Sequence, residues 1–220
     1  MNKRIKKILI VFGTRPEAIK MAPLVRMLKL DKKFNIMVCI TGQHKEMLNQ
    51  VLEIFNIVPD FDLSLMKSGQ TLPELTSRIL VGMHEVYKTF TPDIVLVHGD
   101  TTTTFSAALS AYYSKIPIGH VESGLRTGNN YSPWPEEINR KLTGALANIH
   151  FAPTQISKNN LLAENIDEKN IYVVGNTVVD SLLLAKGMLE SDKNLGRRNR
   201  TTAPSVVCQT PWYLPRRQHR

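Results

Sequence analysis

Val95-Leu-Val-His-Gly-Asp100-Thr-Thr-Thr-Thr104 is the stretch that decides the fold class, because an apolar strand ends in an acid and hydroxyl residues then begin a helix. Ile116-Pro-Ile-Gly-His-Val-Glu122-Ser-Gly-Leu-Arg126 follows the same plan. Ser132-Pro-Trp-Pro-Glu136-Glu-Ile-Asn-Arg140 adds a third acid, on the first turn of a helix. The carboxyl ends of the strands border the ligand crevice of an open α/β sheet. These acids are therefore candidates for proton transfer.

Strand and helix patterns alternate outward from this stretch, which is typical of a parallel sheet with helices on both faces. We expect strands at residues 5–12, 34–41, 93–98, 118–121, 149–152 and 171–174. A plausible helix follows each strand, with clear patterns at about residues 16–30, 46–56, 72–90 and 177–189. Residues 58–70, rich in Pro, Asp and Ser, predict a loop. The sequence thus predicts a Rossmann-like α/β domain over residues 1–190.

The composition describes an ordinary globular chain. Its 220 residues, 42% of them hydrophobic, suffice for one large domain or for one domain and a fragment of another. Cys39 and Cys208 form neither a disulfide framework nor a metal-spaced cluster, and Cys39 fits a small core residue. The basic start precedes an apolar run too short for a signal peptide, and no stretch has transmembrane length. We expect a cytoplasmic protein with no membrane partner.

The formal net charge of +9 is concentrated at one end. Residues 193–220 hold seven Lys or Arg and no acid, which leaves 21 basic and 19 acidic side chains in residues 1–192. This body shows no basic stripe of the kind that nucleic-acid binding requires. Residues 191–220 also lack any apolar period. They are either a disordered basic tail or, as we favour, the mark of a truncation or frameshift that removed the true second half.

Gly13-Thr14-Arg15-Pro16-Glu17 follows the first strand, where Rossmann-type folds place a phosphate loop. The G-x-G-x-x-G pattern is missing, so the dinucleotide fingerprint is absent. A helix N-terminus with a guanidinium beside it still binds an anion through free N–H groups and a bidentate fork, and Lys20 lies one turn further along. The alternative is a simple helix start with a surface arginine, and both interpretations stay open.

The four hydroxyls after Asp100 exceed what a helix cap requires. One of them caps the helix in the simplest interpretation, while Thr101 and Thr102 are candidates for binding a sugar or phosphate. The pairs His98-x-Asp100 and His120-x-Glu122 place each His on the same strand face as its acid. Two such pairs would cage a metal if they converged; otherwise each His packs beneath its acid and orients it, which we favour.

Glu136 also has two interpretations. Glu136 and Arg140 have the i,i+4 spacing of a surface ion pair. Pro133 and Pro135, however, flank Trp134 and form a stiff aromatic entry to the helix that a plain surface pair would not need. This entry favours a functional acid at position 136.

Six motifs stand in order along the chain. They are Gly13-Thr-Arg-Pro-Glu-Ala-Ile-Lys20-Met-Ala-Pro23, Thr41-Gly-Gln-His44, His98-Gly-Asp100-Thr-Thr-Thr, His120-Val-Glu122-Ser-Gly-Leu-Arg126, Pro133-Trp-Pro-Glu-Glu-Ile-Asn-Arg140 and Gly175-Asn-Thr-Val-Val-Asp180. Together they resemble the non-hydrolysing bacterial UDP-N-acetylglucosamine 2-epimerases over about residues 5–190. The resemblance implies the N-terminal half of a GT-B architecture, which has two Rossmann-like domains and an active site between them.

The resemblance also implies a reaction and a set of site residues. Such enzymes interconvert UDP-GlcNAc and UDP-ManNAc by eliminating UDP and adding it back, need no redox cofactor or metal, and form homodimers. By position, Asp100, Glu122 and Glu136 match the catalytic carboxylates, while Arg15 and Lys20 match the basic residues of the cleft. Gln43 and His44, with Glu136, match the region of a second, allosteric UDP-GlcNAc site.

Two other functions compete with this one. A GT-B glycosyltransferase shares the architecture but would need an acceptor site. A non-catalytic remnant would bind ligand or pair with an intact subunit. The resemblance stops near Leu189, where the family continues into a second domain that supplies most UDP-binding residues, so we expect impaired activity in this chain.

Overall fold

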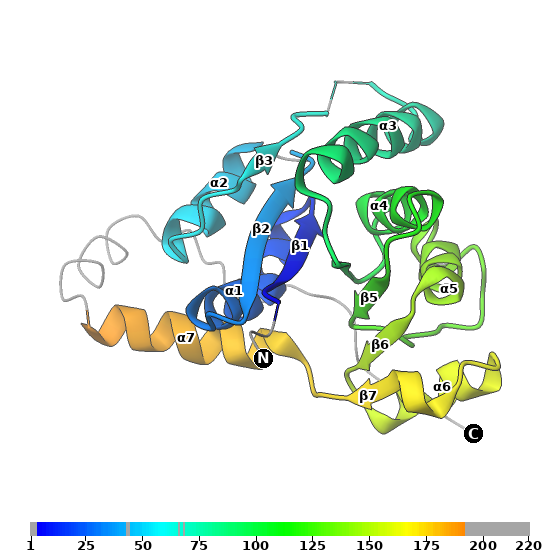
Figure 1. Cartoon of the computed structure of the whole chain (residues 1–220). Helices are drawn as coiled ribbons and strands as arrows, with labels where there is room; N and C mark the ends of the chain where they lie inside the picture. The colour runs from blue at the N-terminus through cyan, green and yellow to red at the C-terminus, as the bar shows by residue number, and fades with distance from the viewer. Residues whose placement is uncertain (1–3, 43–44, 66, 68, 192–220) are drawn as a thin grey trace.

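The computed structural model describes residues 4–42, 45–65, 67 and 69–191. Its centre is a seven-stranded sheet of order β3-β2-β1-β4-β5-β6-β7, with every neighbouring pair parallel (Figure 1). The strands are β1 Lys6–Phe12, β2 Phe34–Ile40, β3 Phe61–Asp62, β4 Ile94–His98, β5 Ile118–Val121, β6 Ile149–Ala152 and β7 Ile171–Val173. The helices are α1 Arg15–Leu30, α2 Lys45–Ile54, α3 Leu72–Phe90, α4 Thr102–Tyr113, α5 Glu136–Leu146, α6 Gln155–Ala163 and α7 Thr177–Ser191. A short 3-10 turn spans Glu168–Asn170.

The predicted Rossmann-like class is confirmed, and the strand limits agree with the prediction to within one residue. The loop predicted for residues 58–70 is wrong at one point, because Phe61–Asp62 forms the edge strand β3. Hydrogen bonds from the Asp60 and Leu63 N–H groups to the β2 carbonyls of Val38 and Ile40 hold it there. A strand of two residues is too short to show any hydrophobic period.

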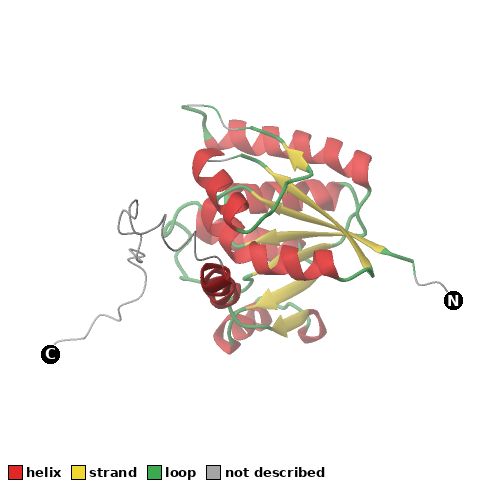
Figure 2. Ribbon diagram, turned by 90° about the vertical axis from the view of Figure 1, so that its left-hand side faces the viewer, coloured by secondary structure: helices red, strands yellow, loops and turns green. Residues whose placement is uncertain are grey.

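Helices cover both faces of the sheet (Figure 2). Along β1, Ile8, Ile10 and Phe12 join a core cluster with side chains of α1, α2 and α7. The intervening Leu9 and Val11 join the opposite cluster with α3 and α4. Both faces of the strand are buried because successive side chains of a strand point in opposite directions. This burial accounts for the continuous apolar run at residues 8–12.

The order of the strands reverses between β1 and β4. From β1 the chain proceeds to β2 and β3 on one side, then returns to β4 and continues through β5, β6 and β7 on the other. In an open α/β sheet this switch point opens a crevice beyond the carboxyl ends of the two strands. The fold therefore brings the turns after β1, β4 and β5 to one edge.

Two further expectations concern single residues and the chain end. Cys39 is fully buried in the core, as predicted. In the part of the chain that the structure describes, no helix has the length and apolar character needed to cross a membrane. Residues 192–220, including Cys208, lie outside the described residues, so the nature of this segment stays a prediction.

Candidate active site

Glu122 occupies the centre of the candidate site, directly after β5. Its side chain is only 12% exposed, and its backbone has a φ of 61°, a left-handed conformation that is uncommon for a non-glycine residue. Lys20 Nζ on α1 lies 2.7 Å from Glu122 Oε2, and Asn176 Nδ2 donates to Oε1 at 3.0 Å. Two segments that are distant from β5 in sequence thus hold this carboxylate at the sheet edge.

His98, at the end of β4, is buried and lies against Glu122 rather than against its sequence neighbour Asp100. Its Nε2 lies 3.6 Å from Glu122 Oε2, and neither ring nitrogen has a hydrogen-bond partner in the described residues. Burial, and secondarily the Lys20 charge, lowers the pKa of His98 to about 3. The ring is therefore neutral at physiological pH.

The two His-x-acid pairs do not form the arrangements that the sequence suggested. His120 Nε2 bonds to the Gly99 carbonyl at 2.7 Å, so His120 supports the turn before Asp100 rather than its own partner Glu122. Burial lowers the pKa of His120 to about 3. Among the described residues, no group of three or more His, Cys, Asp or Glu is placed to hold a metal ion. Each histidine thus lies nearer to the other pair than to its own acid: His98 against Glu122, and His120 against the turn that carries Asp100.

Asp100 lies in the turn between β4 and α4 and is paired with an arginine. Arg140 Nη2 and Nε of α5 lie 2.7 and 2.9 Å from Asp100 Oδ2, and Asn139 Nδ2 donates to the Asp100 carbonyl at 2.9 Å. Arg140 Nη1 also lies 3.0 Å from Glu137 Oε2. The alternative pairing of Arg140 with Glu136 is therefore wrong, because the guanidinium points at Asp100 and Glu137.

Glu137 and Glu136 are adjacent but differ in their surroundings. Glu137 is fully buried and accepts hydrogen bonds from the N–H groups of Thr127 and Gly128. Burial opposes its ionised form, but these bonds and Arg140 outweigh burial and lower the pKa of Glu137. Glu136 is half-buried and forms no hydrogen bond or ion pair with any residue of the described ranges. Glu136 thus remains available for a ligand.

The turn between β1 and α1 is already occupied by the side-chain carboxyl group of Glu17. Glu17 Oε2 accepts hydrogen bonds from the Gly13 and Thr14 N–H groups at 2.9 and 2.6 Å. Thr14 caps the helix and completes a capping box with Glu17. A side chain at Gly13 would collide with the hydroxyls of Thr41 and Thr103. The Gly13 and Thr14 N–H groups are therefore already bonded within the chain, so an anion at this turn would depend on Arg15 and Lys20.

The hydroxyls after Asp100 serve mainly the structure. Thr101 caps α4 and donates to Glu17 Oε1 at 2.7 Å, which confirms that one hydroxyl is the cap. The Thr104 hydroxyl lies within hydrogen-bond distance of the same Glu17 oxygen and of the His98 carbonyl, while Thr103 is bonded to Thr41. Thr102 is half-buried and has no hydrogen-bond partner among the described residues. Only Thr102 keeps a hydroxyl uncommitted.

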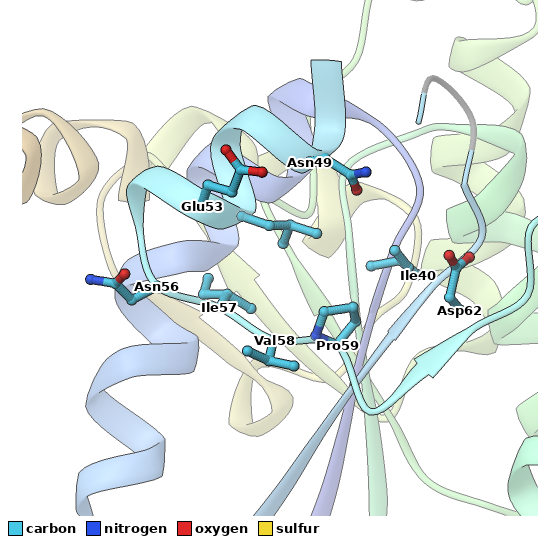
Figure 3. A pocket seen from close by; sticks show the side chains of 9 residues that line it. Ile40, Asn49, Glu53, Asn56, Ile57, Val58, Pro59 and Asp62 are labelled. Carbon is cyan, nitrogen blue, oxygen red and sulfur yellow. The ribbon is translucent and has the colours of Figure 1, made fainter. Parts of the chain in front are cut away.

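The remaining predicted residues are placed unequally. Arg15, the first residue of α1, is half-buried and unpaired within the described residues, whereas Lys20 is committed to Glu122. Gln43 and His44 lie outside the described residues. The pocket in Figure 3, about 540 Å³, lies between α2 and β3 and is lined by side chains such as Asn49, Glu53 and Asp62. None of the predicted site residues within the described ranges lines it.

Sequence reasoning assigned no site role to Glu17, Glu137 or Asn176. Glu17 had a local signal, since Thr14-Arg-Pro-Glu17 fits the capping-box pattern. Glu137 and Asn176 had none, because their partners are identified only by the folded geometry.

The chain is similar in sequence and in structure to known proteins of one family. A family model described as UDP-N-acetylglucosamine 2-epimerase matches residues 26–210. The UDP-N-acetylglucosamine 2-epimerase of Salmonella typhimurium is 60% identical over 187 residues, or 84% of this chain and 50% of that protein. The crystal structure of UDP-GlcNAc 2-epimerase from Neisseria meningitidis bound to UDP-GlcNAc is 53% identical with a TM-score of 0.85, and the match covers 89% of this chain and 53% of that one.

A more distant likeness concerns the fold alone. A lipopolysaccharide outer core galactosyltransferase matches with a TM-score of 0.54 at 17% identity, over 78% of this chain and 45% of that one. The fold is thus the Rossmann-like N-terminal half of a GT-B architecture, and the chain spans about half the length of the relatives it matches. From the family match and the identity of its relatives, this chain belongs to the UDP-N-acetylglucosamine 2-epimerase family.

Proposed function

We propose that this chain is the carboxylate-bearing half of an enzyme that interconverts UDP-GlcNAc and UDP-ManNAc. A base removes the C2 proton while the bond between C1 and the UDP oxygen breaks, which gives 2-acetamidoglucal and UDP. UDP then returns to C1 as a proton is delivered to the opposite face of C2. Proton removal and return require positioned acid and base groups, and the departing diphosphate requires positive charge.

One observation carries the proposal: Glu122 and Asp100 both lie at the switch-point edge, each held by a cation. Lys20 holds Glu122 and Arg140 holds Asp100, so both carboxylates are oriented before substrate arrives. We assign Glu122, Asp100 and Glu136 to proton transfer. Arg15, Lys20 and Thr102 are assigned to the UDP-sugar, while Thr101, whose hydroxyl is bonded to Glu17, holds the start of α4 beside them.

The chain spans about half the length of its relatives, and the other half has a part in the proposed function. The relatives are about twice as long, so a second domain would supply the remaining UDP contacts, and the chain by itself would bind UDP-sugar weakly and turn over little. Residues 191–220 would then follow the end of the first domain. Gln43, His44 and Glu136 would contribute to an allosteric UDP-GlcNAc site, and the intact enzyme would be a cytoplasmic homodimer.

Proton–deuterium exchange at C2 of UDP-GlcNAc in D₂O, followed by NMR, tests the proposal. We expect little exchange with this chain and full exchange with a longer version that carries a family second domain. Glu122→Gln in the longer version should abolish exchange, whereas Lys186→Gln, a surface change on α7, should leave it intact. If exchange survives Glu122→Gln, the assignment of Glu122 to the chemistry is wrong.

The same experiment separates the two competing functions. A glycosyltransferase would release UDP without exchanging the C2 proton, and the galactosyltransferase likeness at 17% identity supports only the fold. A non-catalytic remnant would co-elute with an intact epimerase subunit in size-exclusion chromatography. Absence of both co-elution and ligand binding would leave the remnant hypothesis without support.

A further inference from the structure

Asn176 lies between the candidate acid Glu122 and the start of α7. It belongs to Gly175-Asn-Thr-Val-Val-Asp180, the one sequence motif for which the proposed function gives no role. Its Nδ2 donates to Glu122 Oε1 at 3.0 Å, while its Oδ1 accepts from the Val178 N–H at 3.0 Å. Asn176 is 54 residues from Glu122 in sequence, so only the fold brings them together.

The two ends of the Asn176 amide have different and complementary partners. The Val178 N–H can only donate, so the oxygen of the amide must face the helix. The amino group must therefore face Glu122, and an ionised carboxylate is the acceptor that strengthens such a bond. The position calls for an acceptor and a donor on two separate atoms of a short side chain, which the asparagine amide offers.

The contact belongs to a closed ring of interactions around Glu122. Lys20 on α1 contacts both oxygens of the carboxylate, and Asn176 donates to one of them, Oε1. The buried Ser181 of α7 then donates to the carbonyl of Ile19, the residue before Lys20, at 2.6 Å. The two elements that hold Glu122 are thus also fastened to each other.

We propose that Asn176 is a positioning residue for Glu122, which transmits the position of α7 to the acid through a single amide. The inference rests on the proposed function for its catalytic meaning, but the contact itself is testable without ligand. Glu122 also has a left-handed backbone, which is uncommon for a non-glycine residue.

Asn176→Asp is the sharpest variant, because aspartate caps a helix about as well as asparagine. It replaces the donor that faces Glu122 with a carboxylate and leaves the acceptor for Val178. We expect Asn176→Asp to raise the unfolding equilibrium constant of the 220-residue chain by about tenfold or more. In a Glu122→Ala background the same change should have no cost, because the repelling charge is gone.

A second cycle with Asp100→Ala is the matched control, since Asp100 lies in the same site but makes no contact with Asn176. We expect the full cost of Asn176→Asp to persist there. An equal cost of Asn176→Asp in the wild-type and Glu122→Ala backgrounds, or no cost in either, would overturn the proposal.

A spectroscopic measurement covers the case in which Glu122→Ala does not fold. Asn176→Ser keeps a good capping oxygen but lacks the amino group. The ¹³C signal of the Glu122 carboxyl carbon should then move while that of Glu136 stays in place. An unmoved Glu122 signal would also overturn the proposal.

The catalytic consequence is measured separately. In a longer, active version, Asn176→Ser should lower kcat for C2 exchange by about tenfold or more, which is the effect expected from losing one charge-assisted hydrogen bond. KM should stay within about twofold of the wild-type value. The stability cycles and the carboxyl signal need no substrate, so they fail only if the contact is absent. A lack of exchange in the wild type would count against the proposed function alone.

Discussion

The starts of α1 and α5 are two helix N-termini with acids in the first turn, and they use those acids in opposite ways. At α1, Glu17 is buried and bonded to the Gly13 and Thr14 N–H groups. At α5, Pro135 precedes the helix with no side-chain cap, and Glu136 has no partner in the described residues. An acid whose oxygens are all occupied supports the fold, whereas an accessible and uncommitted acid can meet a ligand.

The structural acids of the two helix starts, Glu17 and Glu137, also differ in the direction of their pKa shifts. Burial raises the pKa of Glu17 despite its hydrogen bonds to threonine hydroxyls and backbone N–H groups. At α5 the buried neighbour Glu137 takes the structural part, bonded to Arg140, and its pKa is lowered. The first turn of α5 thus has one structural acid, Glu137, and one acid available for a ligand, Glu136. The first turn of α1 has only the structural acid, Glu17.

Glu17→Ala should have the largest effect on stability. It leaves the Gly13 and Thr14 N–H groups and the Thr101 and Thr104 hydroxyls without their shared acceptor, which we expect to cost roughly 3 kcal/mol. Denaturant unfolding measures the loss. Glu136→Ala is the matched control and should stay within about 0.5 kcal/mol of wild type. Equal losses in the two variants would erase the distinction between the two helix starts.

Lowering the pH from 7 to 5 should reduce stability through the buried histidines. The pKa values of His98 and His120 fall from the usual 6.5 to about 3, so the unfolded chain binds more protons below pH 6.5 and stability drops as pH falls. We expect up to about 2 kcal/mol per histidine, with the raised pKa of Glu17 opposing part of it.

Unfolding free energies of wild type and His120→Asn at both pH values check this expectation. The variant lacks one of the titrating groups, so its loss between pH 7 and 5 should be smaller. The Glu17→Gln variant keeps both histidines but lacks the carboxyl group that opposes them. Its unfolding free energy should therefore fall more between pH 7 and 5 than that of wild type. A loss that is the same in all three proteins would show that other groups control the acid response.

Arg140→Met should have an intermediate effect, because it removes the common partner of Asp100 and Glu137. Glu137 keeps its bonds to the Thr127 and Gly128 N–H groups, and Asp100 is partly exposed, so we expect a loss of about 2 kcal/mol, less than for a fully buried pair. Lys141→Met, the neighbouring change, removes one surface bond to Asn130 and serves as the control in thermal unfolding. A smaller loss for Arg140→Met than for Lys141→Met would contradict the network.

Glu136→Gln should have the smallest effect on stability, below about 0.5 kcal/mol, and a large effect on the chemistry. In a longer, active version we expect C2 exchange to fall by about 100-fold or more, since positioned acids and bases contribute at that level. Retained exchange with unchanged stability would mean that Glu136 is an ordinary exposed acid and that the two helix starts differ only in capping.

Local sequence patterns were enough for most of the fold. Alternating strands and helices predicted the parallel sheet, and the limits of Ile118–Val121, Ile149–Ala152 and Leu72–Phe90 agree exactly with the structure. The edge strand Phe61–Asp62 escaped prediction because two residues carry no period and pair only once β2 is in place. The capping box at Thr14 and Glu17 was available to sequence reasoning, since both partners are three residues apart.

The sequence by itself determined the α/β class, the order of the motifs and the family, because these depend on residue periods and on short segments that are read locally. Only the tertiary structure decided which charges meet: Lys20 with Glu122 across 102 positions, Arg140 with Asp100 across 40, and Asn176 with Glu122 across 54. Such contacts depend on the strand order around the switch point. A spacing rule within one helix or strand cannot contain that information.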